Sequence, residues 1–249
     1  MRRIIKTAIP AALRRLYIYH QIARGVNINF WRLTALYRAA LVSMGNNYAR
    51  RLNAAVGGLE ATSEVATSRK YADLDYWLRV TIARALCLEL VDSKRKKILD
   101  LGCGTGLFMA ISRQYGHDVW GVDLPFERMS GEDRVVYAAG CEALGLQDRI
   151  ARVAVTRDFH LPKPYMTMRY DIITAFMIRF YFKDCGYWKV EDWEKFITVV
   201  RSLLAPRGYC HLEFNKETEL FPETHFVDGD VTAFFKRVGK FENGIFRFS

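Results

Sequence analysis

The stretch Ile98-Leu99-Asp100-Leu101-Gly102-Cys103-Gly104-Thr105-Gly106 decides the fold class of this chain. A short apolar strand from Lys97 to Leu101 runs into three closely spaced glycines, and a helical pattern begins near Leu107. Glycine tolerates positive φ angles and lets the backbone approach a ligand, while the start of the following helix offers free N–H groups. This order predicts a nucleotide-binding βα unit, although several classes of nucleotide binders use such a turn.

A second strand that ends in a carboxylate follows the glycine turn. This strand is Val119-Trp120-Gly121-Val122-Asp123, and its acidic end comes about 20 residues after the glycines, the usual distance for a ribose-binding acid. We therefore expect Asp123 to accept hydrogen bonds from both hydroxyls of a ribose.

Together, these segments resemble motif I and its acidic successor in the class I S-adenosylmethionine-dependent methyltransferases. The Gly-x-Gly-x-Gly spacing favours this family over NAD dehydrogenases, and the resemblance covers about residues 94–249. Later landmarks follow in the order of the family: Asp158 after the third strand, Leu161-Pro162 and Tyr170-Asp171 before the fourth, and Leu203–Gly208 before the fifth. The last of these resembles a Leu-x-Pro-Gly-Gly turn in which Arg207 replaces one glycine.

The resemblance implies S-adenosylmethionine as the cofactor. The residues implied to bind it are Asp100, Gly102, Cys103, Gly104, Gly106, Asp123, Leu124, Asp158, Phe159 and Phe176. Asp100 would hold the amino group, Asp123 the ribose diol, and the glycine backbone would pass beneath the methionine and the ribose. Leu124 would lie against the adenine, and Asp158 and Phe159 would contact the edge of the adenine ring. A structural turn carboxylate at Asp100 and an ordinary exposed acid at Asp158 remain alternatives.

The methyl acceptor is expected past the end of the fourth strand, in the segment 175–181. This segment has neither the Asn- or Asp-Pro-Pro-aromatic motif of nucleic-acid amino-methyltransferases nor the Glu-His pair of many small-molecule members. In-line transfer from a sulfonium depends on proximity, and a base is needed only for a poorly acidic hydroxyl. The catalytic residue is therefore unassigned, with Tyr181, Arg179 and His160 as candidates. His211 is interpreted as a core residue.

The expected fold class is α/β: a Rossmann-like, mostly parallel seven-stranded sheet with helices on both faces and a C-terminal antiparallel hairpin, preceded by a helical N-terminal extension. Further strands are expected at 118–122, 151–155, 170–176 and 209–214, and helices at 72–91, 107–115, 134–144 and 191–204. Residues 234–248 are expected to form the hairpin around Asn243-Gly244. The aromatic stretch 187–193 is either an acceptor wall or the packing of the next helix.

Two domains are expected, a basic helical extension or cap at 1–70 and an S-adenosylmethionine-binding methyltransferase domain at 71–249, with its core at 94–249. The net charge of +10 lies entirely in the first part, because the chain has ten basic and no acidic residues up to Leu59. A helix after Asn27 or Asn29 would carry one apolar stripe, and residues 53–69 would form a loop. The members of this stripe are Phe30, Leu33, Tyr37, Leu41, Met44 and Tyr48.

The basic segment has three interpretations. It packs on the catalytic domain as a cap, or residues 1–24 contact an anionic membrane surface, or, less favoured, it binds nucleic acid through phosphate contacts. We expect a cytoplasmic protein, peripheral at the inner membrane face in the second case, since no transmembrane run or secretory signal is present. Five cysteines without a Cys-x-x-Cys pair predict neither a disulfide frame nor a metal site.

These observations predict a bacterial methyltransferase that acts on a hydroxyl of a glycan, a lipid-linked sugar or another small metabolite. An RNA methyltransferase and a non-catalytic S-adenosylmethionine-binding protein are the alternatives, and the sequence leaves the oligomeric state open.

Overall fold

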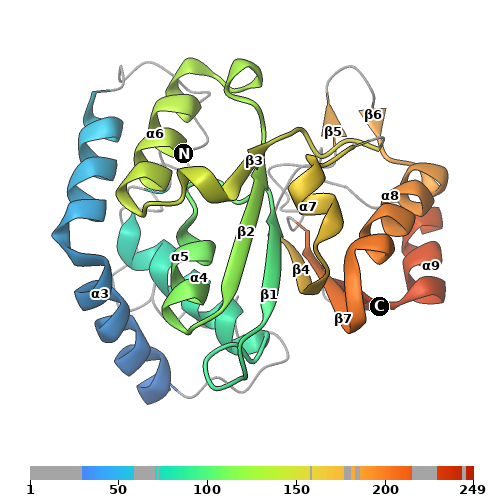
Figure 1. Ribbon diagram of the computed structural model, residues 1–249, viewed down its shortest axis with the longest axis horizontal. Coiled ribbons are helices and arrows are strands. Elements are labelled where there is room, and N and C mark those ends of the chain that lie inside the picture. Colours follow the sequence, from blue (N-terminus) through green and yellow to red (C-terminus); the bar gives the residue numbers. More distant parts are fainter. Residues whose placement is uncertain are drawn as a thin grey trace, which may run out of the picture.

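The computed structural model describes residues 30–58, 71, 73–157, 159–176, 181–182, 186–214, 229–242 and 245–249. Within them, a seven-stranded sheet has the order β3-β2-β1-β4-β7-β9-β8. Its first five strands are parallel, and β9 runs antiparallel to both β7 and β8. Helices α3, α4, α5 and α6 lie on one side of the sheet and α7, α8 and α9 on the other (Figure 1). The predicted Rossmann-like fold with an antiparallel C-terminal hairpin is confirmed.

The bounds of the elements are as follows. The strands are β1 (Lys97–Leu101), β2 (Asp118–Asp123), β3 (Ile150–Arg152), β4 (Tyr170–Phe176), β5 (Tyr181–Phe182), β6 (Gly186–Tyr187), β7 (Leu204–Glu213), β8 (Lys240–Glu242) and β9 (Ile245–Phe248). The α-helices are α3 (Phe30–Gly57), α4 (Leu74–Cys87), α5 (Leu107–Gln114), α6 (Gly131–Ala143), α7 (Lys163–Thr167), α8 (Val190–Leu203) and α9 (Gly229–Val238). Short 3₁₀ turns lie at Phe126–Arg128 and Gln147–Arg149, and β5 pairs with β6 in a separate two-stranded sheet.

The strand order places the candidate site. The chain winds outward from β1 to β2 and β3 on one side and to β4 and β7 on the other, so the order reverses between β1 and β4. Ligands of open α/β sheets bind at such a reversal, outside the carboxyl ends of the strands. The glycine turn, Asp123 and Phe176 all follow or end these central strands, and they therefore share one edge of the sheet.

Helix α3 belongs to the same core as the sheet. Leu33 and Tyr48 are buried as predicted, and α3 packs against α4 and α6. Two details of the prediction were wrong. Leu41 is exposed while Ala40 is buried. The helical repeat, and not the size of the side chain, determines which residues of α3 face the core. The helix also continues to Gly57 instead of ending near Asn53, because Leu52 is buried in the same interface.

The far side of the sheet holds a dense aromatic core. Trp193 packs at a centroid distance of 4.9 Å from both Trp188 and Phe235, and all three rings are buried. The two tryptophans of the stretch 187–193 therefore pack α8 onto the sheet, which is one of the two predicted alternatives. Asp192 caps the beginning of α8, since its Oδ2 accepts a hydrogen bond from the N–H of Lys189 at 3.1 Å.

The predicted bounds of several elements need correction. Residues 234–238 belong to α9, whose buried Val231, Phe234 and Phe235 recur at helical spacing, and the antiparallel pairing of this region is that of β8 with β9. Strand β7 begins at Leu204 rather than Tyr209, with an irregular register opposite Tyr170 and Ile172. Strand β3 ends at Arg152 rather than Val155. Asn243 and Gly244 lie outside the described residues. None of the helices in the described ranges has the length and apolar character needed to cross a membrane.

Candidate cofactor and active site

The glycine turn adopts the backbone that its sequence predicts. Gly102, Gly104 and Gly106 have φ angles of 70°, 57° and 78°, in the left-handed region that favours glycine. The N–H groups of Gly102 and Cys103 both donate to the carbonyl of Val122, at 2.7 and 3.1 Å. The turn is thereby tied to the end of β2, where Asp123 follows.

Asp123 is buried against this turn. Its Oδ2 accepts a hydrogen bond from the N–H of Gly104, and its Oδ1 accepts one from the N–H of Leu124 at 2.7 Å. Burial raises the pKa of the carboxyl group, and the two backbone donors oppose that rise. Each carboxylate oxygen can accept a further hydrogen bond. The group therefore fits the predicted task of holding two ribose hydroxyls.

Asp100 is the second buried carboxyl group at this edge. Only 2% of the residue is exposed, and its Oδ1 accepts a hydrogen bond from Oγ1 of Thr174 at 2.8 Å. Burial raises its pKa to about 7, against the opposing effects of Thr174 and of the Arg84 guanidinium. A cationic amino group placed beside Asp100 would favour the charged carboxylate. The role of Asp100 toward the amino group of the cofactor stays a prediction.

Two tyrosines from outside the predicted core approach the glycine turn. A Cβ atom on Gly104 would lie 3.2 Å from the hydroxyl of Tyr71, and the hydroxyl of Tyr48 donates to Oγ1 of Thr105 at 3.2 Å. The sequence analysis placed Tyr48 only in the apolar stripe and did not single out Tyr71, because both residues lie far from the glycine motif along the chain. The turn is therefore lined by residues that precede the expected core at 94–249.

An ion pair stands at the carboxyl ends of β4 and β7. Glu213 pairs with Phe176 in the register of these strands, and its two oxygens accept hydrogen bonds from Nε and Nη2 of Arg84 at 2.9 and 2.7 Å. The Arg84 guanidinium also lies 4.5 Å from the centre of the Phe176 ring. The sequence analysis did not single out Arg84 or Glu213. The available signal was an arginine on the otherwise apolar face of α4 and a glutamate ending an apolar strand.

The remaining predicted site residues differ in burial, and some of them lie outside the described residues. Phe159 packs against Phe196 in the core, at a centroid distance of 5.7 Å, so a contact with adenine stays a prediction. His160 is exposed, and Leu124 is half-buried beside Asp123. Asp158 and Arg179 lie outside the described residues, as does the side chain of Tyr181, whose backbone forms β5.

His211 is a core residue, as the sequence indicated. It is buried, and its Nδ1 accepts a hydrogen bond from Nε of Arg247 at 2.8 Å. Burial and the neighbouring Arg247 charge lower its pKa to about 4, so the ring is neutral at pH 7. The described residues contain no group of three or more His, Cys, Asp or Glu side chains that could hold a metal ion.

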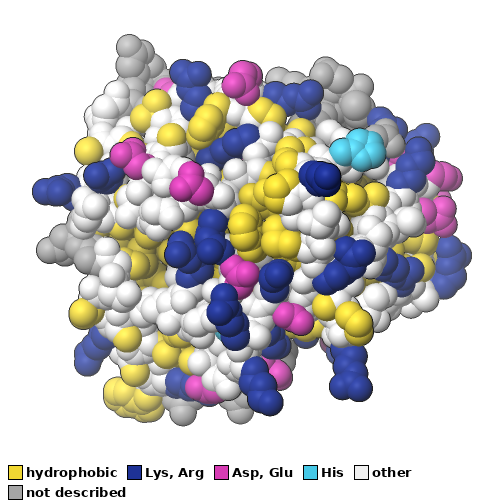
Figure 2. Space-filling view, in the orientation of Figure 1, with side chains coloured by type: hydrophobic (Ala, Val, Ile, Leu, Met, Phe, Trp, Pro, Cys, Tyr) yellow, Lys and Arg dark blue, Asp and Glu magenta, His cyan; other side chains and the backbone are white. Residues whose placement is uncertain are grey.

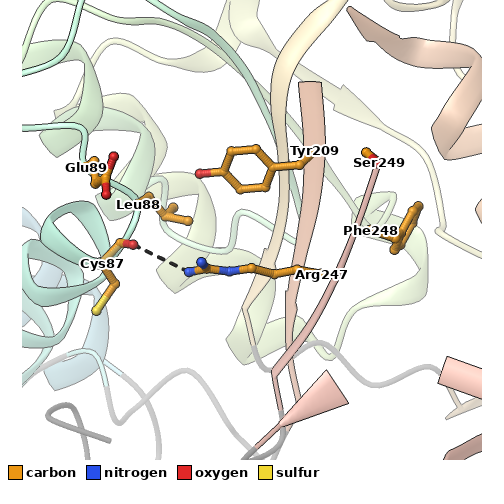
Figure 3. Close-up of a pocket in the computed structure, with 7 residues that line it drawn as sticks. All are labelled: Cys87, Leu88, Glu89, Tyr209, Arg247, Phe248 and Ser249. Atoms are coloured by element: carbon orange, nitrogen blue, oxygen red, sulfur yellow. Dashed lines mark hydrogen bonds between the residues drawn. The ribbon is translucent and has the colours of Figure 1, made fainter. Parts of the chain in front are cut away.

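A separate cavity of about 380 Å³ opens between the end of α4 and strands β7 and β9 (Figure 3). Tyr209 and Arg247 line it, and Arg247 donates to the carbonyl of Cys87 at 3.4 Å. None of its lining residues belongs to the glycine turn or to the carboxyl ends of β1, β2 or β4. This cavity is therefore distinct from the candidate cofactor site.

The arrangement of a left-handed glycine turn and two buried carboxyl groups at a strand reversal fits a nucleoside that carries an amino-acid group. The sequence model of a family described as "Methyltransferase domain" matches residues 74–228. The chain belongs to this family, which confirms the class I methyltransferase resemblance, and the cofactor of this class is S-adenosylmethionine. No curated protein matches the sequence.

Several solved structures are similar to this chain. DesVI of Streptomyces venezuelae is 25% identical over 64% of this chain and 60% of its own, with a TM-score of 0.40. An S-adenosylmethionine-dependent methyltransferase of Clostridium acetobutylicum is 21% identical over 60% and 54%, with a TM-score of 0.40. CalS10 of Micromonospora echinaspora, an amino pentose methyltransferase, is 22% identical over 61% and 55%, with a TM-score of 0.38. The chain thus spans less than two thirds of the length of these proteins.

Proposed function

We propose that this protein transfers the methyl group of S-adenosylmethionine to a hydroxyl of a glycan, a lipid-linked sugar or another small metabolite. The observation that carries the cofactor part is the bridge from Asp123 to the N–H groups of Gly104 and Leu124, beside three left-handed glycines. Membership of the methyltransferase family supports the reaction class.

In this proposal, the predicted cofactor residues at the edge of the sheet contact different parts of the cofactor. Asp123 binds the ribose diol, Leu124 packs on the adenine, and Asp158 and Phe159 address the adenine edge. The backbone of Gly102, Cys103, Gly104 and Gly106 supports the ribose and the methionine part, Asp100 binds the amino group, and Phe176 lies toward the acceptor. The bound cofactor supplies a methyl group on a sulfonium, which is a good leaving group. The protein residues hold and orient the two reactants and exclude water from the space between them.

The acceptor side supports a small molecule more than a nucleic acid. The segment after β4 lacks the Asn- or Asp-Pro-Pro-aromatic motif with which nucleic-acid amines are methylated. On the face in Figure 2, basic side chains are interspersed with acidic ones rather than gathered into one patch. A phosphate backbone would instead favour a continuous basic surface. Tyr181, Arg179 and His160 remain candidates for the base that a hydroxyl acceptor requires.

The basic beginning of the chain is proposed to contact an anionic membrane surface. Residues 1–24 lie outside the described part of the structure and combine six basic residues with apolar ones and no acid. Each basic residue near an anionic leaflet contributes about 1 kcal/mol. In this proposal residues 1–70 form an extension, and residues 71–249 form the domain that binds the cofactor.

Calorimetry with S-adenosylhomocysteine tests the cofactor part. We expect binding by the wild-type protein and a large loss of affinity in Asp123→Ala, whereas Asp148→Ala removes an exposed carboxylate elsewhere and leaves binding unchanged. Absence of binding, or an unchanged affinity in Asp123→Ala, would contradict the proposal.

Incubation with methyl-labelled cofactor and a fractionated cell extract tests the acceptor part. We expect the label in glycan, lipid-linked or small-molecule fractions. Label in RNA would instead support the RNA methyltransferase, and absence of S-adenosylhomocysteine formation with every fraction would support a non-catalytic binding protein.

A further inference from the structure

The cavity of about 380 Å³ at the end of α4 shares no lining residue with the candidate cofactor site, and it has the size of a small-molecule pocket. The side chains of Tyr209 and Arg247 extend from β7 and β9 toward Cys87, Leu88 and Glu89 at the end of the helix (Figure 3). Since a water molecule occupies about 30 Å³, the cavity has room for a molecule much larger than water.

Arg247 is a half-buried cation whose hydrogen bonds in the described residues all go to neutral groups. Its Nε donates to the uncharged ring of His211 at 2.8 Å, and its Nη2 donates to the carbonyl of Cys87 at 3.4 Å. Arg84 and Arg149 instead pair with carboxylates. A partly buried charge is more stable beside a counter-charge, and Nη1 of Arg247 makes no hydrogen bond within the described ranges. The guanidinium is therefore suited to bind an anion that enters the cavity.

Glu89 provides the opposite charge at the rim of the cavity. It is exposed, and it follows Leu88, the residue that caps the end of α4. Its φ angle is 55°, in the left-handed region where a helix end usually has glycine. A residue with a Cβ atom is strained in this conformation, and strain of this kind clusters at functional positions. The Glu89 carboxylate therefore fits a task at the cavity that glycine could not perform.

Tyr209 lies close to both charged groups. Burial raises the pKa of its hydroxyl, while the Arg247 charge lowers it and the Glu89 charge raises it, so both charges lie within electrostatic range of the hydroxyl. The hydroxyl is protonated at neutral pH and can donate to an anion. Leu88 adds an apolar wall. A cation, a carboxylate and an apolar surface around one cavity are complementary to a small zwitterion with an apolar body.

We propose that this cavity binds a small zwitterion of the amino-acid type, with its carboxylate on Arg247 and Tyr209 and its ammonium group on Glu89. The hydrogen bonds to His211 and Cys87 already orient the Arg247 fork, so that little further freedom is lost on binding. Arginine forms shorter and stronger hydrogen bonds to a carboxylate than neutral donors do. The cavity is separate from the cofactor site, and this inference does not rest on the proposed function.

Three probes that differ by one group test the assignment of each charge. L-Phenylalanine carries both groups, 3-phenylpropionate lacks the ammonium group, and phenethylamine lacks the carboxylate. In ligand-observed NMR titrations of the wild type, we expect phenylalanine to bind about tenfold or more tightly than phenethylamine, which lacks the hydrogen bond between charged groups. It should bind about twofold to fivefold more tightly than 3-phenylpropionate, because Glu89 is exposed and water screens its charge.

Variants at the two charged positions should change opposite probes. Arg247→Gln is expected to weaken phenylalanine and 3-phenylpropionate by about tenfold to a hundredfold and phenethylamine by less than about twofold. Glu89→Gln should weaken phenylalanine and phenethylamine by about twofold to fivefold and leave 3-phenylpropionate at least as tight. Tyr209→Phe, which keeps the ring, should weaken the two carboxylate probes alone, and it tests the carboxylate position even if Arg247→Gln does not fold.

Two further variants separate binding from stability. Arg149→Gln is a matched control, since Arg149 is also half-buried, pairs with Asp118 and lies 4.8 Å from the centre of the Trp120 ring, but it is remote from the cavity. It should bind all three probes like the wild type. Glu89→Gly relieves the strained backbone, so it should raise thermal stability and still weaken phenylalanine as Glu89→Gln does.

Several results would overturn this inference. One is the absence of saturable binding by any probe, and another is tighter binding of 3-phenylpropionate or phenethylamine than of phenylalanine. Equal weakening of all three probes in Arg247→Gln and Glu89→Gln would show a structural role. Saturating S-adenosylhomocysteine should leave the affinity for phenylalanine unchanged, and competition would place the probe in the cofactor site instead. A protein that bound phenylalanine as described but not S-adenosylhomocysteine would contradict the proposed function and support the inference.

Discussion

The hydroxyl of Tyr48 in α3 donates a hydrogen bond to Oγ1 of Thr105 in the glycine turn, across 3.2 Å, and both side chains are buried. Helix α3 is therefore joined to the loop that is proposed to hold the cofactor. Burial raises the pKa of Tyr48 to about 12, so its hydroxyl is protonated and remains a donor at neutral pH. Loss of this hydrogen bond is expected to change both the stability of α3 and the geometry of the glycine turn.

Tyr48→Phe is expected to lower the free energy of unfolding by about 1 kcal/mol, because it removes one buried hydrogen bond without a large change of volume. Urea unfolding measures this loss. Thr105→Val and the double variant complete a mutant cycle. We expect the double variant to lose less stability than the sum of the two single losses, with a coupling free energy of about 0.5–1 kcal/mol. Strictly additive effects would show that the contact does not join the two segments.

Gly104→Ala is expected to abolish measurable binding of S-adenosylhomocysteine and to cost about 1–2 kcal/mol of stability. The φ angle of 57° strains any residue with a Cβ atom, and the new methyl group would lie 3.2 Å from the Tyr71 hydroxyl at the proposed seat of the cofactor. Calorimetry and thermal unfolding measure the two effects.

Gly116→Ala is the matched control for that variant. Gly116 has a φ angle of 87°, and a Cβ atom there would meet nothing within 4 Å. It should therefore show a similar loss of stability with unchanged cofactor affinity. If both variants retained binding, the glycine turn would not be the seat of the cofactor.

Cofactor binding is expected to strengthen as the pH rises through about 7, the pKa of Asp100 in the free protein. The ammonium group of the ligand favours the charged carboxylate, so binding below this pH must release the proton from Asp100. Calorimetry of S-adenosylhomocysteine in two buffers with different ionisation enthalpies measures the released proton. In Asp100→Asn, affinity should be lower, and this proton release should disappear. An unchanged proton release in the variant would assign it to another group.

In the absence of a ligand, the Asp100 carboxyl group also makes the free energy of unfolding depend on pH. The pKa of Asp100 is about 7 in the folded protein and near 3.8 in the unfolded chain. Between these values the folded state holds a proton that the unfolded state has lost, so this group makes the protein less stable as the pH rises from about 4 to 7. Urea unfolding across this range should show a shallower decline in Asp100→Asn than in the wild type. An identical pH dependence would contradict the raised pKa.

The sequence predicted the parts of the site that local chemistry determines. The bounds of β1 and β4 agree with the structure, because these central strands are mostly apolar and end at clear signals. The glycines and Asp123 were found for a similar reason, since the turn requires their residue types at that spacing. Tertiary contacts determine the rest: the pair of Arg84 and Glu213 joins residues 129 positions apart, and no local pattern predicts that these two residues meet.

Helix α9 shows a different limit of sequence reasoning. An aromatic-rich segment followed by a turn signal was interpreted as one long hairpin, although Phe234 and Phe235 recur after Val231 at helical spacing. Ring packing on Trp193 and Phe246 selects the helix, because it brings the Phe235 ring into contact with both of these side chains. That packing depends on elements remote in the chain, which a short window of sequence does not contain.

His211→Gln should remove part of the acid sensitivity of the fold. The pKa of His211 is about 4 in the folded protein and near 6.5 in the unfolded chain, so the unfolded state binds a proton first as the pH falls, and stability is lost between about 6.5 and 4. The cause is burial together with the Arg247 and Arg84 charges, and Glu213 opposes them. Asp100 acts in the opposite direction over this range, so the informative quantity is the difference between the wild type and His211→Gln in urea unfolding at several pH values. That difference should shrink as the pH falls, and a constant offset would show that the ring does not resist protonation.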